Sequence, residues 1–335
     1  MSTNLTLTHL RFDVIARNTI KLGREEAGNR LRNALASVML RTVCPERKRG
    51  VPPLPEHVAI CPACWLLAAN VDAGKVRRAY SLVPPIPPRD IVQTGERFSF
   101  VLTLYGEGFN FLPYFVLAVP EMGQGGVGPG RGQFELEAIW AADPLTQTVE
   151  AVLQPGEQMV YLPKSSIGWQ TVHSFATKQR AALEKSQKVQ LRFLTPTRLV
   201  NRKKLVKVPD FGVFFQRMLN RIDQLGQQFA GDKRRNKVEL DRLHQLANQV
   251  RLMETRTRWI DLWSWSGRTR KKSPMGGFVG WATYQAIEWD ELLPWILLGQ
   301  GTHTGKSAVK GNGVFEMAIE GQRGYWEWLF AASLS

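Results

Sequence analysis

A glycine-rich segment near the C-terminus carries the residues best suited to chemistry. Residues 299–313 read Gly-Gln-Gly-Thr-His-Thr-Gly-Lys-Ser-Ala-Val-Lys-Gly-Asn-Gly, so closely spaced glycines accompany His303, Lys306 and Lys310. Glycine adopts backbone angles that are closed to other residues, and it lets the main chain approach a ligand, so such a loop can direct N–H groups at phosphate oxygens. The lysines add positive charge, and a histidine can carry a proton near neutral pH. The segment therefore predicts a phosphate-binding loop with acid–base capacity.

Gly305-Lys306-Ser307 is similar to the end of a P-loop, which has the pattern Gly-x-x-x-x-Gly-Lys-Ser/Thr between a strand and a helix. Gln300 occupies the position where the first glycine is required, and the apolar residues 314–319 that follow favour a strand. We therefore expect no nucleotide cofactor.

Three cysteines and a histidine form a second cluster, in the order Cys44, His57, Cys61 and Cys64. Three cysteines are too few, and odd in number, for a disulfide framework. Thiolates with one imidazole suit a tetrahedral zinc, and the Cys-x-x-Cys spacing is a common half-site. The alternative is that the thiols are small buried side chains and His57 is a loop residue. The pattern predicts a structural zinc that metal analysis can test.

The charge balance points to a polyanionic partner. The chain of 335 residues has 44 Lys and Arg against 29 Asp and Glu, a formal net charge of +15, and a hydrophobic fraction of 44% that favours a folded protein. No apolar run approaches the roughly 20 residues that span a bilayer, and the first residues lack a signal peptide's pattern. We expect a cytoplasmic protein with no membrane partner.

The elements that position these residues follow from apolar periodicity. In the first half we expect strands at 5–16, 98–105 and 134–140, with helices at 25–43 and 111–121. In the second half we expect strands at 189–194, 258–265, 278–287 and 314–319, with helices at 211–229, 238–250 and 289–298. Strand, helix, two strands, helix, strand is the ferredoxin-like arrangement. The predicted fold is α+β, with tandem ferredoxin-like (RRM-like) domains and antiparallel sheets.

The predicted domain boundaries follow the same patterns. Residues 1–145 form the N-terminal ferredoxin-like domain, and its cysteine-bearing, proline-rich insert covers 44–90. Residues 146–188, where apolar periodicity is weakest, form an interdomain connection. Residues 189–335 form the C-terminal ferredoxin-like domain, which binds the polyanion and carries the glycine-rich loop at 299–313.

Several ordered motifs point to one family. They are Phe193-Leu-Thr-Pro196, Arg258-Trp-Ile-Asp261 with Trp265-Ser266, Gly276-Gly-Phe-Val-Gly280, and His303-x-Gly305-Lys306 followed by Gly311-x-Gly313. Over 191–315 the chain thereby resembles the CRISPR-associated endoribonucleases of the RAMP superfamily, which cut precursor CRISPR RNA within its repeats. The first half is similar in Leu112-Pro-Tyr-Phe115, the glycines of 125–132 and the cysteine insert. The resemblance implies the fold expected above and an RNA-cleaving activity.

The resemblance also implies a reaction that needs no metal. A ribose 2′-hydroxyl attacks the adjacent phosphorus and leaves a 2′,3′-cyclic phosphate and a 5′-hydroxyl, and the enzyme retains its product. Histidine suits the proton transfers, and lysines and backbone N–H groups suit the stabilisation of charge. His303 with Lys306 is the predicted catalytic pair. His57 is the alternative, because several relatives have a catalytic histidine after the first helix, but a zinc would occupy its imidazole. The other three histidines are expected bystanders: His9, His173 and His244.

RNA binding is expected from the basic run before Gly276 and from the glycine-rich loop, although a solvated turn would also explain such a run. The predicted RNA-binding residues are Arg268, Arg270, Lys271, Lys272, Gly305, Lys310, Gly311 and Gly313. Trp263 and Trp265 alternate with Ser264, so both indoles should share one side of a strand. They are either buried in the core or stacked on RNA bases.

Two other functions fit the same features. One is a catalytically inactive RNA-binding subunit of a CRISPR effector or adaptation complex. The other is a general DNA-binding protein, which would bind duplex DNA with a steep salt dependence. The expected partners are CRISPR repeat RNA or its processed product and other CRISPR-associated proteins, and no cofactor is required for catalysis.

Overall fold

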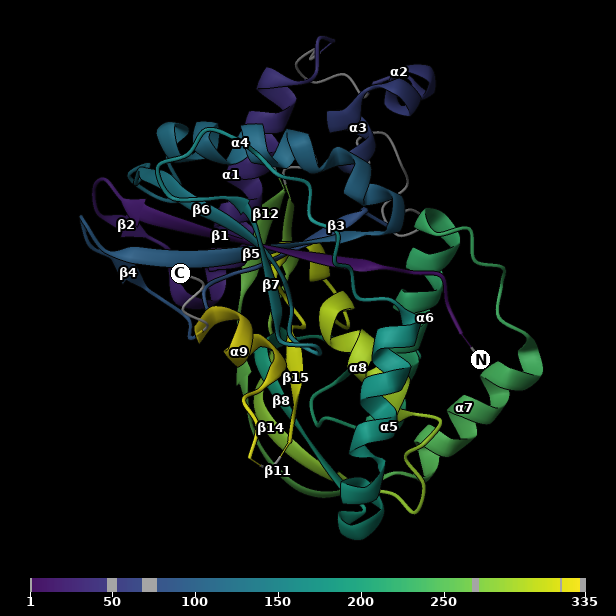
Figure 1. The fold of residues 1–335 in the computed structure, drawn as a ribbon. Helices are drawn as coiled ribbons and strands as arrows, with labels where there is room; N and C mark the ends of the chain where they lie inside the picture. The colour runs from purple at the N-terminus through teal and green to yellow at the C-terminus, as the bar shows by residue number, and fades with distance from the viewer. Residues whose placement is uncertain (1, 47–52, 68–76, 267–270, 320, 332–335) are drawn as a thin grey trace.

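The computed structural model describes residues 2–46, 53–67, 77–266, 271–319 and 321–331. Within these ranges each half of the chain builds one antiparallel sheet with helices against it (Figure 1). This arrangement confirms the predicted α+β class with two ferredoxin-like units.

The first ferredoxin-like unit lies in the N-terminal half. Its elements are β1 (Leu7–Ala16), α1 (Ala27–Thr42), β3 (Tyr80–Val83), β5 (Arg97–Tyr105), α4 (Leu112–Gly125), β6 (Phe134–Asp143) and β7 (Thr148–Leu153). The strands lie in the order β3-β5-β1-β6-β7, and each neighbouring pair is antiparallel. The sequence patterns did not predict β3, which lies inside the proline-rich insert, or β7, which extends the sheet beyond β6. A separate short ribbon pairs β2 (Ile20–Lys21) with β4 (Ile91–Val92).

The second unit repeats this topology. Its elements are β8 (Lys188–Thr197), α6 (Phe211–Phe229), α7 (Lys237–Gln249), β11 (Arg251–Ile260), β14 (Gly277–Gln285), α8 (Leu293–Thr302) and β15 (Phe315–Ala318). The strand order is β11-β14-β8-β15, again all antiparallel. Helix α6 begins at Phe211, and the side chain of its N-cap residue Asp210 accepts a hydrogen bond of 2.8 Å from the backbone N–H of Val213. An N-cap of this kind satisfies one of the free donors at a helix start.

The remaining elements are short or connect the two units. They are the 3-10 turns η1 (Arg24–Glu26), η2 (Gly106–Phe111) and η3 (Ala308–Lys310), the helices α2 (Pro55–Ile60), α3 (Pro62–Leu67), α5 (Trp169–Ser186) and α9 (Tyr325–Ala331), and the strands β9 (Leu199–Asn201), β10 (Lys204–Val206), β12 (Trp263–Ser266) and β13 (Lys271–Pro274). None of the described helices combines the length and apolar character needed to cross a membrane.

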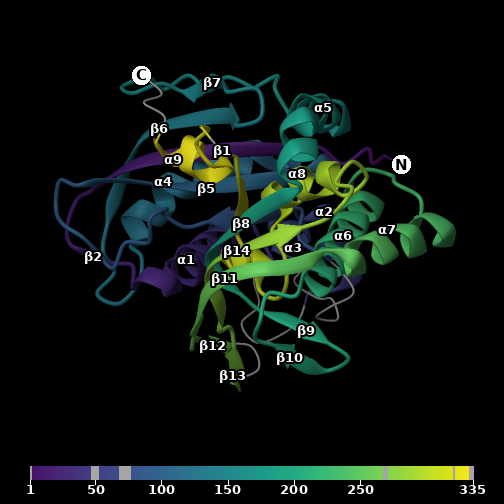
Figure 2. The same cartoon turned by 90° about the horizontal axis from the view of Figure 1, so that it is seen from below.

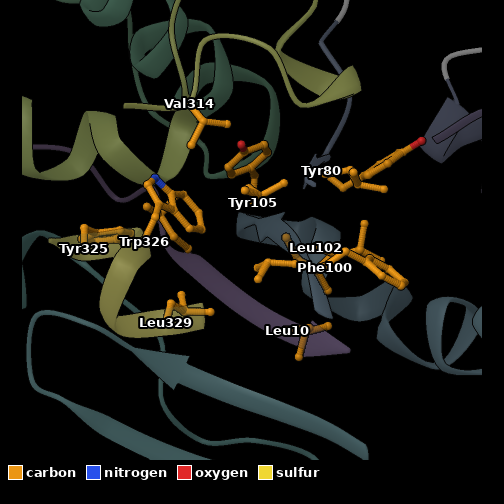
Figure 3. Packing of buried hydrophobic residues seen from close by; sticks show 14 of the residues in the cluster. Leu10, Tyr80, Phe100, Leu102, Tyr105, Val314, Tyr325, Trp326 and Leu329 are labelled. Carbon is orange, nitrogen blue, oxygen red and sulfur yellow. The ribbon is translucent and has the colours of Figure 1, made fainter. Parts of the chain in front are cut away.

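The N-terminal sheet is covered on both faces. Helices α1 and α4 pack on one face, and α8 and α9 lie on the other (Figure 1). Tyr325, Trp326 and Leu329 of α9 extend toward β1 and β5 (Figure 3). A strand between two apolar layers needs apolar side chains on both sides, and β1 is accordingly buried along most of its length.

Residues 146–188, predicted as a connection, contain regular structure. Strand β7 pairs with β6, and Trp169 of α5 packs on Trp295 of α8 with ring centroids 4.4 Å apart. Only Val152 is buried in β7, and most described residues of α5 are exposed, so neither element has a clear apolar periodicity in the sequence.

The structure differs from two further predictions. The predicted strand 258–265 is two strands: β11 ends at Ile260, and β12 leaves the sheet to pair with β13 as a hairpin (Figure 2). The predicted glycine-rich loop is also shorter, because 299–302 complete α8. A Cβ on Gly299 would lie 2.1 Å from the sulfur of Met218, and one on Gly301 would lie 2.5 Å from Leu7. These two glycines therefore serve close helix packing rather than ligand binding.

Candidate functional site

The glycine-rich loop closes on itself after α8. The backbone N–H of Thr304 donates to the carbonyl of Gly313 at 2.9 Å, and the N–H of Gly313 donates to the carbonyl of Pro196 at 3.1 Å. Gly305 and Gly313 have φ values of 76° and 72°, and a Cβ on Gly313 would lie 1.8 Å from the carbonyl oxygen of Thr304. Only glycine fits such positions without strain, so these glycines shape the loop itself.

The far end of the loop touches the N-terminal domain. Gly311 has φ 82°, and a Cβ there would lie 2.7 Å from Pro84 and 3.1 Å from the carbonyl oxygen of Leu82 at the end of β3. Nearby, Arg258 of β11 lies 3.8 Å from Glu25, just before α1. The loop is thus held where the two domains meet.

His303, the predicted catalytic histidine, is inside the protein. Its side chain is 0% exposed, and its Nδ1 lies 3.2 Å from the carbonyl oxygen of Ala308. The ring meets Trp326 edge-on, with centroids 5.9 Å apart. Burial, reinforced by the charge of Arg221, lowers the pKa of His303 to about 3. A general acid or base must reach its substrate, so this position does not fit the predicted role. His303 instead packs inside the loop, where its Nδ1 contacts the carbonyl oxygen of Ala308.

Lys306, its predicted partner, differs from His303 in its exposure to solvent. The residue is exposed, and its backbone N–H donates to the carbonyl of Arg198 at 3.1 Å. One member of the predicted pair is therefore buried and the other faces solvent, so the structure does not bring them together as an acid–base pair.

Lys310 occupies the junction of the two domains. Its Nζ donates to the hydroxyl of Ser264 in β12 at 2.7 Å and lies 3.9 Å from the sulfur of Met275. Burial lowers the pKa of Lys310 to about 8, and the positive charges of Arg32 in α1 and Arg78 before β3 act in the same direction. We call Gly28, Arg32, Arg78, Ser264 and Lys310 the interdomain seam.

One hydrogen-bond donor of the interdomain seam lacks an acceptor among the described residues. The Nε atom of Arg32 is buried and has no hydrogen-bond partner among the described residues. Buried donors are normally paired, and three positive side chains close together repel one another. A bound phosphate would supply both the acceptor and the opposite charge.

The hairpin of β12 and β13 presents aromatic and basic groups beside the seam. Trp263 and Trp265 are 60% and 59% exposed, while Ser264 between them is 3% exposed and turns inward to Lys310. Of the two readings of the tryptophan pair, burial in the core is therefore wrong. Lys272 is exposed on β13. Arg268 and Arg270 lie outside the described residues, and for Lys271 only the backbone in β13 is described.

A groove lined by arginines extends from α1, and it was not among the sites expected from sequence patterns. A cavity of about 320 Å³ lies between α1 and the glycines of 125–128, and Arg30, Arg41 and Arg131 line it. The available signal was the placement of arginines off the apolar stripe of α1, together with Arg131 among glycines. Such a groove suits a phosphate backbone.

The four predicted metal ligands converge. The ligand atoms of Cys44, His57, Cys61 and Cys64 all lie within 4.8 Å of one another, and all four residues are buried. The sulfur of Cys44 lies 3.3 Å from Nε2 of His57 and 3.6 Å from the sulfur of Cys64. The cluster joins the C-terminal end of α1 to α2 and α3 and could hold a metal ion.

Both ring nitrogens of His57 have partners in or beside this cluster. Its Nε2 faces the thiols, and its Nδ1 lies 3.1 Å from a carboxylate oxygen of Glu46. A metal-binding histidine commonly donates its second nitrogen to a carboxylate in this way. This placement does not fit the alternative catalytic role of His57.

The remaining histidines lie elsewhere. His9 of β1 is buried, with Nδ1 2.7 Å from the hydroxyl of Thr103 and Nε2 2.6 Å from that of Tyr325. His173 is exposed on α5, and His244 is half-buried on α7. Of the five histidines, all within the described ranges, none belongs to the interdomain seam.

Comparisons with known proteins agree with this architecture. A family model for the CRISPR-associated endoribonuclease Cas6 matches residues 191–315, and a second model, described as an N-terminal domain, matches residues 5–165. No curated protein matches the sequence.

Among solved structures, a Cas6 product complex has a TM-score of 0.57 at 16% identity, covering 92% of this chain and 98% of that chain. Thermus thermophilus Cas6 has a TM-score of 0.55 at 14% identity, covering 94% and 99%. A partial Cas6-RT-Cas1–Cas2 complex has a TM-score of 0.57 at 12% identity, covering 94% of this chain and 46% of that chain. These structures show the fold, and over residues 191–315 the chain is similar to the CRISPR-associated endoribonuclease Cas6.

Proposed function

We propose that the protein cleaves CRISPR repeat RNA within precursor transcripts and retains the processed guide RNA. The observation that carries the proposal is the interdomain seam, where the charges of Arg32 and Arg78 act on Lys310, which donates to Ser264 of the exposed aromatic hairpin. Three cations that repel one another in a partly buried position gain stability when a phosphate binds between them. We place this activity in the cytoplasm, where precursor transcripts are made.

The surfaces around the seam suit a single RNA strand. Exposed indoles offer faces on which bases stack, and Trp263 and Trp265 stand side by side on the hairpin. The groove lined by Arg30, Arg41 and Arg131 suits the phosphate backbone on the N-terminal side. From the predicted binding set, Lys310 joins the seam, Lys272 adds charge on the hairpin, and Gly305, Gly311 and Gly313 act by shaping the loop.

We propose that cleavage proceeds by attack of the ribose 2′-hydroxyl on the adjacent phosphorus, without a metal. The products are a 2′,3′-cyclic phosphate and a 5′-hydroxyl. The seam supports this chemistry because its cations can stabilise the extra negative charge that the phosphorane-like transition state carries.

The decisive experiment uses the full chain, a transcript of the repeat adjacent to its own locus, and excess EDTA. We expect one cut per repeat, with a cyclic phosphate on the upstream product. The same RNA with a single 2′-deoxy sugar at the cleavage site should bind equally well and remain intact. Tight, repeat-selective binding without cleavage would instead favour the inactive RNA-binding subunit.

The partner proteins are a further part of the proposal. One similar structure belongs to a Cas6-RT-Cas1–Cas2 complex, in which the matched chain is about twice as long as this one. We infer that this chain also works beside other CRISPR-associated proteins. Co-purification from the native host, with and without ribonuclease treatment, would separate direct protein contacts from contacts made through RNA.

We propose that Cys44, His57, Cys61 and Cys64 bind a structural zinc. Three thiolates and one imidazole match the ligand preference of a tetrahedral zinc site. The carboxylate of Glu46 on Nδ1 of His57 leaves Nε2 free of its proton and able to act as a ligand. The zinc would hold α2 and α3 against α1, and no step of RNA cleavage is assigned to it.

A further inference from the structure

We propose that Lys310 is the catalytic proton donor to the leaving 5′-oxygen, and that Arg32 and Arg78 hold the scissile phosphate. This inference rests on the proposed function and goes further by naming the acid. Its basis is geometric: the backbone of Lys310 lies against Gly28 of α1 in the N-terminal domain, and its side chain donates to Ser264 of the aromatic hairpin.

None of the five histidines, all of which the structure describes, is placed to donate a proton at the interdomain seam. His303 and His9 are fully buried, and His57 belongs to the cysteine cluster. His173 is exposed on α5 and His244 is half-buried on α7, and neither belongs to the interdomain seam. If the chain cleaves RNA at the seam, the proton must come from another group, and Lys310 is the one placed there.

The surroundings of Lys310 suit an acid. An ordinary lysine holds its proton too firmly to release it quickly near neutral pH, but burial and the charges of Arg32 and Arg78 weaken that hold. The resulting pKa of about 8 keeps the ammonium largely protonated at neutral pH and near the optimum for general acid catalysis. Arginine cannot take this role because its guanidinium group stays protonated in proteins.

The hydrogen bond to Ser264 gives the ammonium its direction. Lys310 donates to the hydroxyl of Ser264 at 2.7 Å and lies 3.9 Å from the sulfur of Met275, and an ammonium group has three donors in all. The third donor is left for an RNA oxygen without breaking either contact. Ser264 is therefore a positioning residue, and it ties the acid to the hairpin that carries the two exposed indoles.

The 2′-oxygen forms a bond to phosphorus while the bond between phosphorus and the 5′-oxygen breaks. The proton of the 2′-hydroxyl passes to water, and one ammonium proton of Lys310 passes to the 5′-oxygen. Neutral Lys310 then regains a proton from solvent. Arg32 and Arg78 neutralise the non-bridging oxygens throughout and exchange no proton.

Single-turnover cleavage tests the assignment with three variants. Lys310→Arg keeps the charge but holds its proton, and Lys310→Ala removes both. Each should cut about 10²–10⁴-fold more slowly, while RNA affinity in EDTA changes far less for Lys310→Arg. Lys185→Ala is the control, because Lys185 is an exposed lysine on α5 that belongs to neither the loop nor the interdomain seam. It should cut at a rate close to wild type.

A modified substrate isolates the proton donor from general electrostatics. RNA with sulfur in place of the bridging 5′-oxygen has a leaving group that needs no proton. We expect Lys310→Ala to cut this RNA nearly as fast as wild type does. An equal defect on both RNAs, or wild-type cleavage by Lys310→Arg, would overturn the role of Lys310 alone. A wild-type protein that cuts neither RNA would overturn the proposed function itself.

Discussion

Gly28 of α1 and Gly311 of the glycine-rich loop lie against each other, so that a Cβ on Gly311 would be 3.3 Å from the Cα of Gly28. A Cβ on Gly28 would in turn lie 2.2 Å from the carbonyl oxygen of Lys310. These two residues are 283 positions apart in the chain. Because neither has a side chain, the backbones of the two domains can come into contact here. This contact fixes the distance from Arg32, one turn along α1, to Lys310.

Gly28→Ala should therefore separate α1 from the loop. The added methyl group meets backbone atoms on the loop, which cannot rotate away, and we expect a loss of about 1–3 kcal/mol in the free energy of unfolding. Cleavage should fall more than RNA affinity, because the seam is distorted while the outer surfaces remain. Thermal unfolding and single-turnover rates measure the two effects.

Gly125→Ala is the matched control for Gly28→Ala. Gly125 lies in α4, and the nearest atom to an added Cβ would be a nitrogen of Arg41 at 3.7 Å, an ordinary contact. This variant should be as stable as wild type or slightly more so, since alanine favours helix. If both variants behave alike, the contact between Gly28 and the loop does not set the geometry of the seam.

The buried histidines predict a loss of stability in acid. Burial lowers the pKa values of His9 and His303 from 6.5 to about 3. Below pH 6.5 the unfolded chain binds protons that the folded chain excludes, so stability is complete above pH 6.5 and declines as the pH falls toward 3. Each such histidine contributes a slope of ~1.4 kcal/mol per pH unit well inside this window.

His303→Gln should remove one of these two slopes. The free energy of unfolding of the variant, measured by urea denaturation from pH 7 to pH 4, should fall less steeply than that of wild type. Because other titrating groups are common to both proteins, the difference isolates His303. RNA cleavage at pH 7 should persist in folded His303→Gln. Parallel stability curves, or abolished cleavage with unchanged RNA binding, would contradict the structural role of His303.

Most of the fold was predictable because its helices and central strands are amphipathic or apolar. Helix α6 matches its predicted bounds, since a strong apolar stripe and the cap at Asp210 mark its start. Elements at the edges were not predictable in the same way. Strand β3 lies in a proline-rich insert, and β7 and α5 are held mainly by contacts with distant segments.

Sequence patterns identified the glycine-rich loop, but they could not assign the surroundings of its side chains. The glycine-rich loop does lie at the junction of the domains, yet sequence spacing cannot show which side of a loop faces solvent. His303 and Lys310 are seven residues apart, and the first is buried behind Trp326 while the second reaches Ser264. The roles assigned to arginines of α1 depend on domain packing, which no local pattern encodes. The cysteine cluster was predictable because its residue types and spacing define it.

Removal of the metal should loosen the insert rather than the whole fold. We expect one zinc per chain by elemental analysis of purified protein. Incubation with a strong chelator should lower the thermal midpoint and expose α2 and α3 to proteolysis, and added zinc should restore both. Glu46→Gln should weaken zinc affinity by about 10–100-fold without removing a ligand. Metal-free protein with unchanged stability and proteolysis would show that the thiols are simply packed side chains.

The exposed indoles should contribute to RNA affinity but not to stability. Trp263→Ala and Trp265→Ala remove surfaces that are more than half exposed, so the free energy of unfolding should change little. Each should weaken binding of repeat RNA by about 1–3 kcal/mol if a base stacks there. Tyr161, an aromatic residue that is 44% exposed on the segment after β7, provides the control, and Tyr161→Ala should bind as wild type does.

Fluorescence of the tryptophans should also be quenched on RNA binding, and this quenching should shrink in each tryptophan variant. Unchanged affinity in the double variant Trp263→Ala with Trp265→Ala would place the RNA path away from the hairpin, along the arginine groove of α1.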